Sequence, residues 1–383
     1  MDPDFDLDAF LDLACEMLTV PSTVDRPNDL NRALELALDT VGPGFTVEQF
    51  TSNGKPSALV YCGTSRPEFR VILNGHLDVV PAEPSQFTPR VVGDRLIGRG
   101  AQDMKVSALA MALAFRDLAP RLPYALGLQL VTDEEVGGHD GTRHQVWQGV
   151  RGDFVIIGEY TGLDIVADSK GLLHARLLAE GRAGHGAYPW LGSNALLAIV
   201  EAINRLLARY PVPLAEEWRT TVNLARIETA NPAVNQIPAT ATAWFDLRFP
   251  AEDADLSDRT RDEAGRYLQS VCGPRVRVEV DRFEPAHHAD HDHADIARLR
   301  AAAQAEGYAG ALLRKHGSGD GRFYSQHGIP AVAFGVGGAG QHGPDEYADI
   351  TTFAPYHRAL CRFLLDAGAL AGDEPGDRAR PGV

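Results

Sequence analysis

The segment LQLVTDEEVGGHDG, residues 128–141, places two adjacent glutamates, Glu134 and Glu135, directly after an apolar run. The apolar residues predict a buried β-strand, and Gly137 and Gly138 predict a sharp turn just beyond it. Adjacent carboxylates repel each other, so a strand that leaves a core is an unusual place for such a pair. Because neighbouring residues on an extended chain point to opposite sides, we expect the two glutamates to have different roles. One would hold a metal ion, and the other would handle a proton.

The segments around this strand alternate between helical and strand patterns. Strands of continuous apolar character that alternate with helices predict an α/β fold, with a mostly parallel sheet flanked by helices. The expected helices cover residues 5–19, 29–40 and 107–119, and the expected strands cover residues 57–63, 69–80, 124–134 and 154–159.

The pattern changes near residue 170. Residues 171–283 read as strand, helix, two strands, helix and strand, which predicts an inserted α+β open-faced sandwich. Helix and strand then alternate again, so residues 1–170 and 284–383 are expected to form one discontinuous domain. The residues after 370 are rich in Pro, Gly and charge, and we expect them to be frayed.

Composition excludes several classes of partner. The 383 residues are 44% hydrophobic and 23% charged, as in a globular protein, and the net charge of −16 disfavours nucleic acid. No apolar run reaches the roughly 18 residues of a membrane span. The acidic N-terminal segment lacks the pattern of a secretory signal, which favours a cytoplasmic location. The four scattered cysteines suggest neither disulfides nor a thiolate zinc site.

Metal-binding residue types follow the apolar runs. At the carboxyl ends of parallel strands, where ligands bind in open α/β sheets, such residues are expected to converge. Each alone is more often a cap or a loop contact, but two imidazoles and several carboxylates together suit Zn²⁺ or a similar metal. They exceed what one tetrahedral ion needs, which favours two ions that share a carboxylate. The residues are His76, Asp78, Asp103, Glu134, Glu135, Glu159 and His342.

Several short motifs carry a family resemblance. The stretches GHLDVVP, GRGAQDMK, TDEEVGG, GHGAYP and QHGPDE occur in this order. Together they resemble the dinuclear zinc aminoacylase family, which includes acetylornithine deacetylases, succinyl-diaminopimelate desuccinylases, carboxypeptidase-type enzymes and aminoacylases. The resemblance extends from about residue 8 to residue 368 and includes the insert, so it implies a zinc-peptidase-like catalytic domain.

The resemblance implies a ligand set for two Zn²⁺ ions, with Co²⁺ as a possible substitute. Asp103 would bridge the two ions. His76 and Glu159 would complete one site, and Glu135 and His342 would complete the other.

The resemblance also implies catalytic roles. Glu134 would be the general base, which takes a proton from a metal-bridging water and passes it to the leaving nitrogen. Asp78 would accept the free N–H of His76 and fix its tautomer. The peptide bond between Asp103 and Met104 would be cis.

Further residues are assigned to the insert and to substrate binding by the same resemblance. His185 would donate to the oxyanion of the tetrahedral intermediate, in its own active site or in that of a partner subunit. The insert would then act as a lid and as the interface of a homodimer. Asn235, Arg248 and Arg322 would contact substrate, since an arginine can bind a carboxylate through two hydrogen bonds.

The predicted function is a metal-dependent amide hydrolase that removes an acyl group from an N-acyl amino acid or a related small amide. A dipeptidase or carboxypeptidase-type exopeptidase is the alternative, since it would use the same centre. A non-catalytic binding protein and a single structural metal are also considered. The histidine-rich stretch HHADHDH, residues 287–293, is expected to be a loop before a helix and not a further metal cluster.

Overall fold

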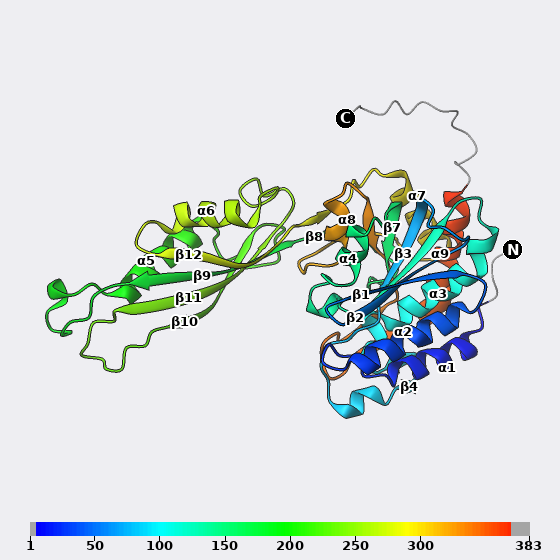
Figure 1. Cartoon of the computed structure of the whole chain (residues 1–383), viewed down its shortest axis with the longest axis horizontal. Helices are drawn as coiled ribbons and strands as arrows, with labels where there is room; N and C mark the ends of the chain where they lie inside the picture. Colours follow the sequence, from blue (N-terminus) through cyan, green and yellow to red (C-terminus); the bar gives the residue numbers. More distant parts are fainter. Residues whose placement is uncertain (1–4, 369–383) are drawn as a thin grey trace, which may run out of the picture. The chain divides into compact units, whose positions relative to one another are not determined.

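The computed structural model describes residues 5–368, which fold into two compact units (Figure 1). The first unit contains the described residues up to Ala167, together with Ala289–Leu313 and those from Gly319 onward, and the second contains Asp168–His288 and Arg314–Ser318. Residues 171–283, the predicted insert, fall in the second unit, and their roles as lid and dimer interface stay predictions. The predicted frayed end after residue 370 lies outside the described residues.

The largest sheet is mixed and most of its strands lie in the first unit, which confirms the predicted α/β class. Its strand order is β1-β2-β6-β3-β7-β15-β8-β13, with β14 beside β8. The central strands β6, β3, β7 and β15 are parallel, whereas the pairs β1–β2, β2–β6, β15–β8 and β8–β13 are antiparallel. The bounds are β1 Thr46–Ser52, β2 Lys55–Tyr61, β3 Phe69–His76, β6 Leu126–Val131, β7 Gly152–Ile157, β8 Ile165–Ser169, β13 His287–His288, β14 Leu312–Lys315 and β15 Ala331–Ala333.

Helices cover both faces of this sheet (Figure 1). Val71 and Leu73 of β3 pack into a large core with α3 and α9, whereas Ile72 packs into a second cluster with Tyr324 of α8. This alternation explains why the central strands are apolar throughout. Among the described residues, none of the helices has both the length and the apolar character needed to cross a bilayer. The helices are α1 Leu7–Leu18, α2 Pro27–Val41, α3 Val106–Leu118, α4 Thr142–Trp147, α7 Ala294–Ala305, α8 Gly321–Ser325 and α9 Phe353–Ala367.

A small antiparallel sheet in the first unit was not predicted. Its strands are very short, and its order is β16-β17-β5-β4. It joins residues that lie just before Asp103 to residues on both sides of His342, and so holds together two loops that are far apart in the sequence. The strands are β4 Arg90–Val92, β5 Arg95–Ile97, β16 Gly338–Ala339 and β17 Tyr347–Asp349.

The second unit has the predicted order of strand, helix, two strands, helix and strand. Its sheet has the order β10-β11-β9-β12, which leaves β10 at an edge. Alternate residues of β9, among them Leu173, Ala175 and Leu177, are buried in a core with the two helices. The elements are β9 Gly171–Glu180, α5 Ala195–Arg209, β10 Thr221–Glu228, β11 Thr240–Phe249, α6 Arg261–Cys272 and β12 Arg277–Glu284.

Candidate metal centre

The central parallel strands bring the predicted ligands to one edge of the sheet. His76 is the last residue of β3, and Glu134 and Glu135 follow β6. Glu159 lies two residues beyond the end of β7, and His342 lies in the glycine-rich segment after β15. The strands β6, β3, β7 and β15 are neighbours in the sheet, so their carboxyl ends meet at one place.

Asp103 lies between the two histidines. Its Oδ1 is 3.0 Å from His76 Nε2, and its Oδ2 is 3.3 Å from His342 Nε2. His76 Nε2 is also 3.6 Å from Glu159 Oε1, and His342 Nε2 is 3.1 Å from Glu135 Oε2. One carboxylate therefore faces two half-sites, each made of an imidazole and a further carboxylate.

Glu134 lies beside one of these half-sites. Its carboxylate, His76 and Glu159 offer ligand atoms that all lie within 4.8 Å of one another, as do His76, Asp103 and Glu135. The two adjacent glutamates thus belong to different groups of side chains. A cation could reach Glu134 as well, so its predicted role outside the ligand set stays a prediction.

The backbone around the glutamates differs from the expected extended strand. Glu134–Val136 forms a single 3₁₀ turn, in which the Val136 N–H donates to the backbone oxygen of Asp133. The backbone N–H groups of Glu134 and Glu135 donate to Asp78 Oδ1 and Oδ2, at 3.2 and 3.0 Å. The expected reason for their separate roles, alternation along a strand, is therefore wrong.

The contact between His76 and Asp78 also differs from the expectation. His76 Nδ1 lies 3.1 Å from the main-chain oxygen of Asp78 and 3.6 Å from its carboxylate. The nearest acceptor for the free ring N–H is thus the main-chain oxygen. The Asp78 carboxylate is occupied mainly by the two glutamate amides.

The segment that carries Asp103 is irregular and tightly held. The peptide bond between Asp103 and Met104 is cis, as the resemblance implied. The buried Glu346 accepts hydrogen bonds through Oε1 from the backbone N–H groups of Gln102 and Asp103, at 3.1 and 3.2 Å. Its other oxygen pairs with Arg99. Sequence reasoning assigned no role to Glu346, although this residue ends the quoted motif QHGPDE.

The site concentrates negative charge in a poorly solvated place. Burial, followed by the nearby Glu159 carboxylate, raises the pKa of Glu134 well above its usual range, and burial also raises the pKa of Glu135. Hydrogen bonds to Asp103 and then Glu135 raise the pKa of His342 to about 10. In His76, burial opposes the charged ring, but Asp103 and Asp78 outweigh it and raise the pKa. The carboxylates thus favour positive charge on the two histidines that lie between them.

The donor set fits metal cations. Imidazole nitrogens and carboxylate oxygens are ligands of Zn²⁺ and similar ions, and a carboxylate with one oxygen toward each half-site is suited to bridge two of them. Buried carboxylates that lie close together repel one another. A bound cation would offset this repulsion in place of the protons that the raised pKa values favour.

Two of the other predicted residues meet within the second unit. The exposed His185 pairs with Gln236 across an isolated bridge, and the Gly186 N–H donates to the backbone oxygen of Asn235 at 2.7 Å. The His185 Nδ1 accepts from the Ala187 N–H at 3.1 Å, which orients the ring and leaves Nε2 as the nitrogen that can carry a proton. Two segments far apart in sequence thus present His185 and Asn235 side by side.

The two predicted substrate-binding arginines have protein partners. Arg248, half-buried on β11, donates to Asp246 Oδ1 and Oδ2 at 2.7 and 3.2 Å. Arg322 of α8 is 3% exposed and donates to the backbone oxygens of Gly137 and Gly319, at 2.6 and 2.7 Å. Arg322 therefore holds the turn that follows the glutamate pair. Contact of either arginine with substrate stays a prediction.

Comparison with known proteins gives consistent matches over most of the chain. The chain is 31% identical to succinyl-diaminopimelate desuccinylase of Methylobacterium sp. (strain 4-46), over 96% of this chain and 98% of that protein. It is 33% identical to a probable carboxypeptidase of Aspergillus terreus, over 68% of this chain and 65% of that protein.

Solved structures show the same fold at lower identity. The aminopeptidase PepT of Bacillus cereus matches with a TM-score of 0.76 and 17% identity, over 94% of this chain and 99% of that one. The M20 family metallo-carboxypeptidase Sso-CP2 of Sulfolobus solfataricus matches with a TM-score of 0.74 and 18% identity, over 94% of this chain and 99% of that one.

The sequence model of Peptidase family M20/M25/M40 matches residues 72–366. Together with the paired half-sites around Asp103, these matches show that the chain belongs to Peptidase family M20/M25/M40.

Proposed function

We propose that this protein is a metal-dependent hydrolase that removes the acyl group from an N-acyl amino acid or a related small amide. The observation that carries the proposal is Asp103, whose two carboxylate oxygens face two separate imidazole and carboxylate pairs. We further propose that two Zn²⁺ ions fill these half-sites, that Co²⁺ can replace them, and that the enzyme acts in the cytoplasm.

When bound, such a pair of cations polarises the substrate carbonyl and lowers the pKa of water to about 7. Glu134 would accept the proton from the attacking water and deliver it to the nitrogen that leaves. Its position beside the proposed ligands His76 and Glu159 supports this role, because a general base must lie within hydrogen-bond reach of the proton that it accepts. Asp78 would keep both glutamates in place through their backbone amides.

The relatives support hydrolysis of a carbon–nitrogen bond and leave two substrate classes open. Desuccinylase relatives match nearly the whole length of the chain, which favours an N-acyl amino acid. The carboxypeptidase relative and the solved peptidase structures favour a small peptide as the second candidate. In the segment GSGDGRF, Ser318 and Gly319 stand where desuccinylases tend to have threonine and serine, so we do not propose succinyl as the acyl group.

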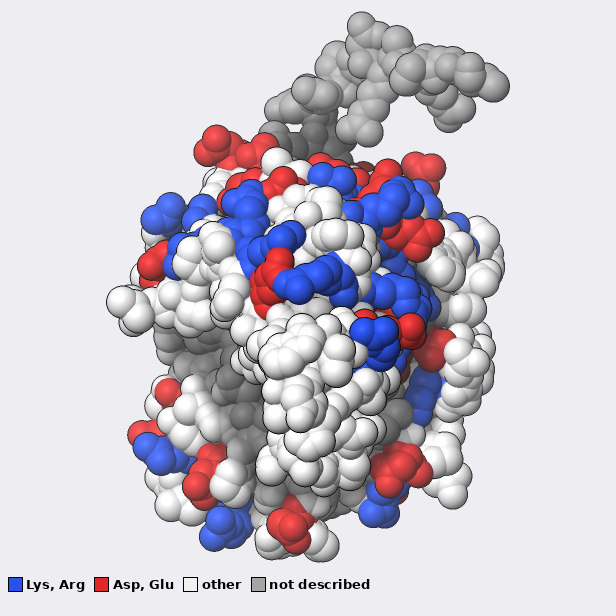
Figure 2. Space-filling view, turned by 90° about the vertical axis from the view of Figure 1, so that its left-hand side faces the viewer, with Lys and Arg blue, Asp and Glu red and all other residues white. Residues whose placement is uncertain are grey.

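We also propose that the protein forms a homodimer through the second unit. The loop before α5 and the first turn of this helix expose large apolar side chains, with Trp190, Leu191 and Leu197 at 73%, 58% and 62% exposure. Figure 2 shows a broad uncharged area beside a region rich in Lys and Arg. A second copy that covers these residues would remove them from water. His185 would then act in the active site of its own subunit or of its partner.

The first prediction concerns the proton carrier. In a Glu134→Gln variant, turnover should fall by about 10²–10⁴-fold, because the amide cannot accept the proton. The bound metal content, measured by elemental analysis, should stay at the wild-type level. A Glu135→Gln variant is the contrast, since it should lose metal as well as activity. Normal turnover in Glu134→Gln would refute the assigned role.

A second prediction concerns Asp78. Replacement by asparagine keeps the size of the side chain but leaves only one oxygen to accept from the two glutamate amides. We expect metal affinity or kcat to fall by about 10–100-fold. The exposed Asp39 on α2 provides the control, because Asp39→Asn should leave both quantities unchanged. Equal behaviour of the two variants would count against the positioning role of Asp78.

A third prediction concerns the substrate. Protein freed of metal with a chelator should be inactive, and Zn²⁺ or Co²⁺ should restore activity toward an N-acyl amino acid. N-acetyl and N-succinyl amino acids and dipeptides are compared side by side by kcat/KM. A clear preference for dipeptides would replace the acyl-removing function by the peptidase alternative. Activity on none of these amides, with metal bound, would reject the hydrolase proposal for these substrates.

A fourth prediction concerns His185 and the dimer. His185→Ala and Glu134→Gln subunits are each expected to be nearly inactive as pure proteins. If His185 completes the partner's site, mixed dimers contain one site with both residues intact, and activity should reappear on mixing. Sedimentation checks that the subunits exchange. Mixed dimers that remain inactive would show that His185 does not act in the partner's site.

A further inference from the structure

His342, a proposed ligand, has a backbone conformation that its surroundings must maintain. Its φ of 60° lies in the left-handed region, which residues other than glycine adopt infrequently. Its side chain is 53% exposed, so packing of the imidazole ring does not hold the residue in place. The position of this ring therefore depends on what holds the backbone of its loop.

Two side chains hold the carbonyl of the next residue. The backbone oxygen of Gly343 accepts from Arg99 Nη2 at 3.0 Å and from Gln86 Nε2 at 2.9 Å. The Gly343 N–H donates to the Gly340 backbone oxygen at 2.9 Å, which closes the turn that contains His342. Arg99 is only 2% exposed, so water competes little for its guanidinium.

The same guanidinium also reaches the loop of the bridging carboxylate. Arg99 Nη1 pairs with Glu346 Oε2, and Glu346 is itself 1% exposed. The other oxygen of Glu346 accepts from the backbone N–H groups of Gln102 and Asp103, at 3.1 and 3.2 Å. Arg99 thus holds the Gly343 carbonyl through one nitrogen and, through Glu346, the segment of Asp103 through the other.

The shape of the arginine side chain suits this arrangement. Its planar guanidinium presents Nη1 and Nη2 in fixed directions, so the two acceptors bound to them are held at a fixed separation. Here the acceptors belong to the loops of Asp103 and His342, whose side chains lie 3.3 Å apart. Because burial of an ion pair costs desolvation energy, such a pair is weak evidence for a role in stability alone.

We propose that Arg99 is a positioning residue of the candidate metal centre, where it sets the separation of Asp103 and His342. It acts through Glu346 and the Gly343 carbonyl and is not itself a ligand. The inference rests on the two-ion centre of the proposed function. Loss of the guanidinium should let the two loops move apart, which weakens binding of the ion that His342 holds.

Arg70 offers a matched control in the same unit. Its Nη2 lies 2.7 Å from both carboxylate oxygens of Asp295, which is 1% exposed and keeps Arg298 as a second partner at 2.6 Å. Arg70 is near the start of β3, whereas His76 ends this strand. Arg70→Met and Arg99→Met each break an ion pair with a buried carboxylate, but only the second change affects the loops of the metal centre.

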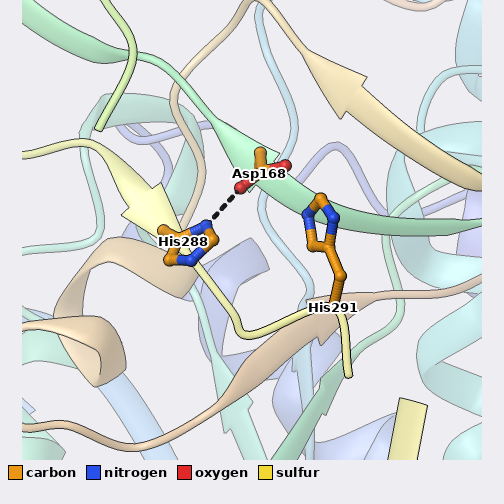
Figure 3. A group of neighbouring side chains, drawn as sticks. All are labelled: Asp168, His288 and His291. Atoms are coloured by element: carbon orange, nitrogen blue, oxygen red, sulfur yellow. Dashed lines mark hydrogen bonds and ion pairs between the residues drawn. The ribbon is translucent and has the colours of Figure 1, made fainter. Parts of the chain in front are cut away.

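His288 offers a second control, in the second unit. Its Nδ1 lies 2.6 Å from Oδ1 of the buried Asp168, which belongs to the same unit (Figure 3). His288→Ala removes a hydrogen bond to a buried carboxylate, together with an exposed imidazole. Any zinc that this histidine binds adventitiously is measured in this way and subtracted from the total.

The fifth prediction tests Arg99 by metal affinity. Each variant is dialysed to equilibrium against buffered free Zn²⁺, and zinc per chain is measured by elemental analysis. In Arg99→Met, one of the two ions should need about 10–100-fold more free Zn²⁺ for half-occupancy, whereas Arg70→Met should match the wild type. In a His342→Ala background, which lacks this ion, Arg99→Met should have little further effect.

The visible absorption spectrum of Co²⁺-loaded protein separates positioning from stability, because it depends on the geometry of the ligands. At saturating Co²⁺, Arg99→Met should change this spectrum and Arg70→Met should not. Arg99→Lys keeps the charge but not the fixed fork, so its zinc affinity should be intermediate. Circular dichroism checks that each variant is folded, and Arg99→Lys is compared with Arg70→Lys if Arg99→Met does not fold.

Three results decide between the possible roles. Zinc affinity and a cobalt spectrum equal to those of the wild type in folded Arg99→Met would overturn the positioning role. Equal changes in Arg99→Met and Arg70→Met would also overturn it, because they would reflect stability alone. Loss of zinc affinity in Arg99→Met alone, with no amide hydrolysis by the metal-loaded wild type, would contradict the proposed substrates and support this inference.

Discussion

The geometry of the candidate metal centre depends on the position of one carboxylate. The oxygens of Asp103 lie 3.0 and 3.3 Å from nitrogens of His76 and His342, and each histidine has a further carboxylate next to it. This arrangement gathers negative charge where water is scarce, and such charge is tolerated only when protons or cations compensate it. The neighbouring carboxylates raise the pKa of both histidines, which is the effect expected of negative charge gathered around an imidazole.

A layer of hydrogen bonds keeps these side chains in place. Glu346 accepts the backbone N–H groups of Gln102 and Asp103, and the small antiparallel sheet joins this loop to the one that carries His342. Asp78 has the same function for the glutamate turn. In each case a carboxylate accepts hydrogen bonds from two backbone N–H groups. The proposed ligands are therefore held by the path of the chain, which limits how far they can move apart under mutual repulsion.

The meeting of four proposed ligands, all except Asp103, could be predicted from the sequence because they follow strongly apolar strands of a parallel sheet, whose carboxyl ends share one edge. Asp103 instead lies in an irregular segment before α3. The family motifs then supplied the grouping around Asp103. The small sheet was missed because its strands, such as Gly338–Ala339, are too short to carry a periodic pattern. The roles of Glu346 and of the Asp78 carboxylate were missed or misassigned because they depend on contacts with backbone groups, which residue types do not encode.

The arginines show why residue type alone does not define a role. Arg248 and Arg322 were both predicted to bind substrate, yet they have different environments. Arg248 already forms two hydrogen bonds with Asp246, so a substrate carboxylate would have to compete with that partner. Arg322 is almost fully buried, and its donors point at backbone oxygens beside the glutamate turn. Binding of substrate by Arg322 would require release of this turn, whereas Arg248 could exchange partners at the surface of its sheet. Of the two, Arg248 is therefore the better placed to recognise an anionic group.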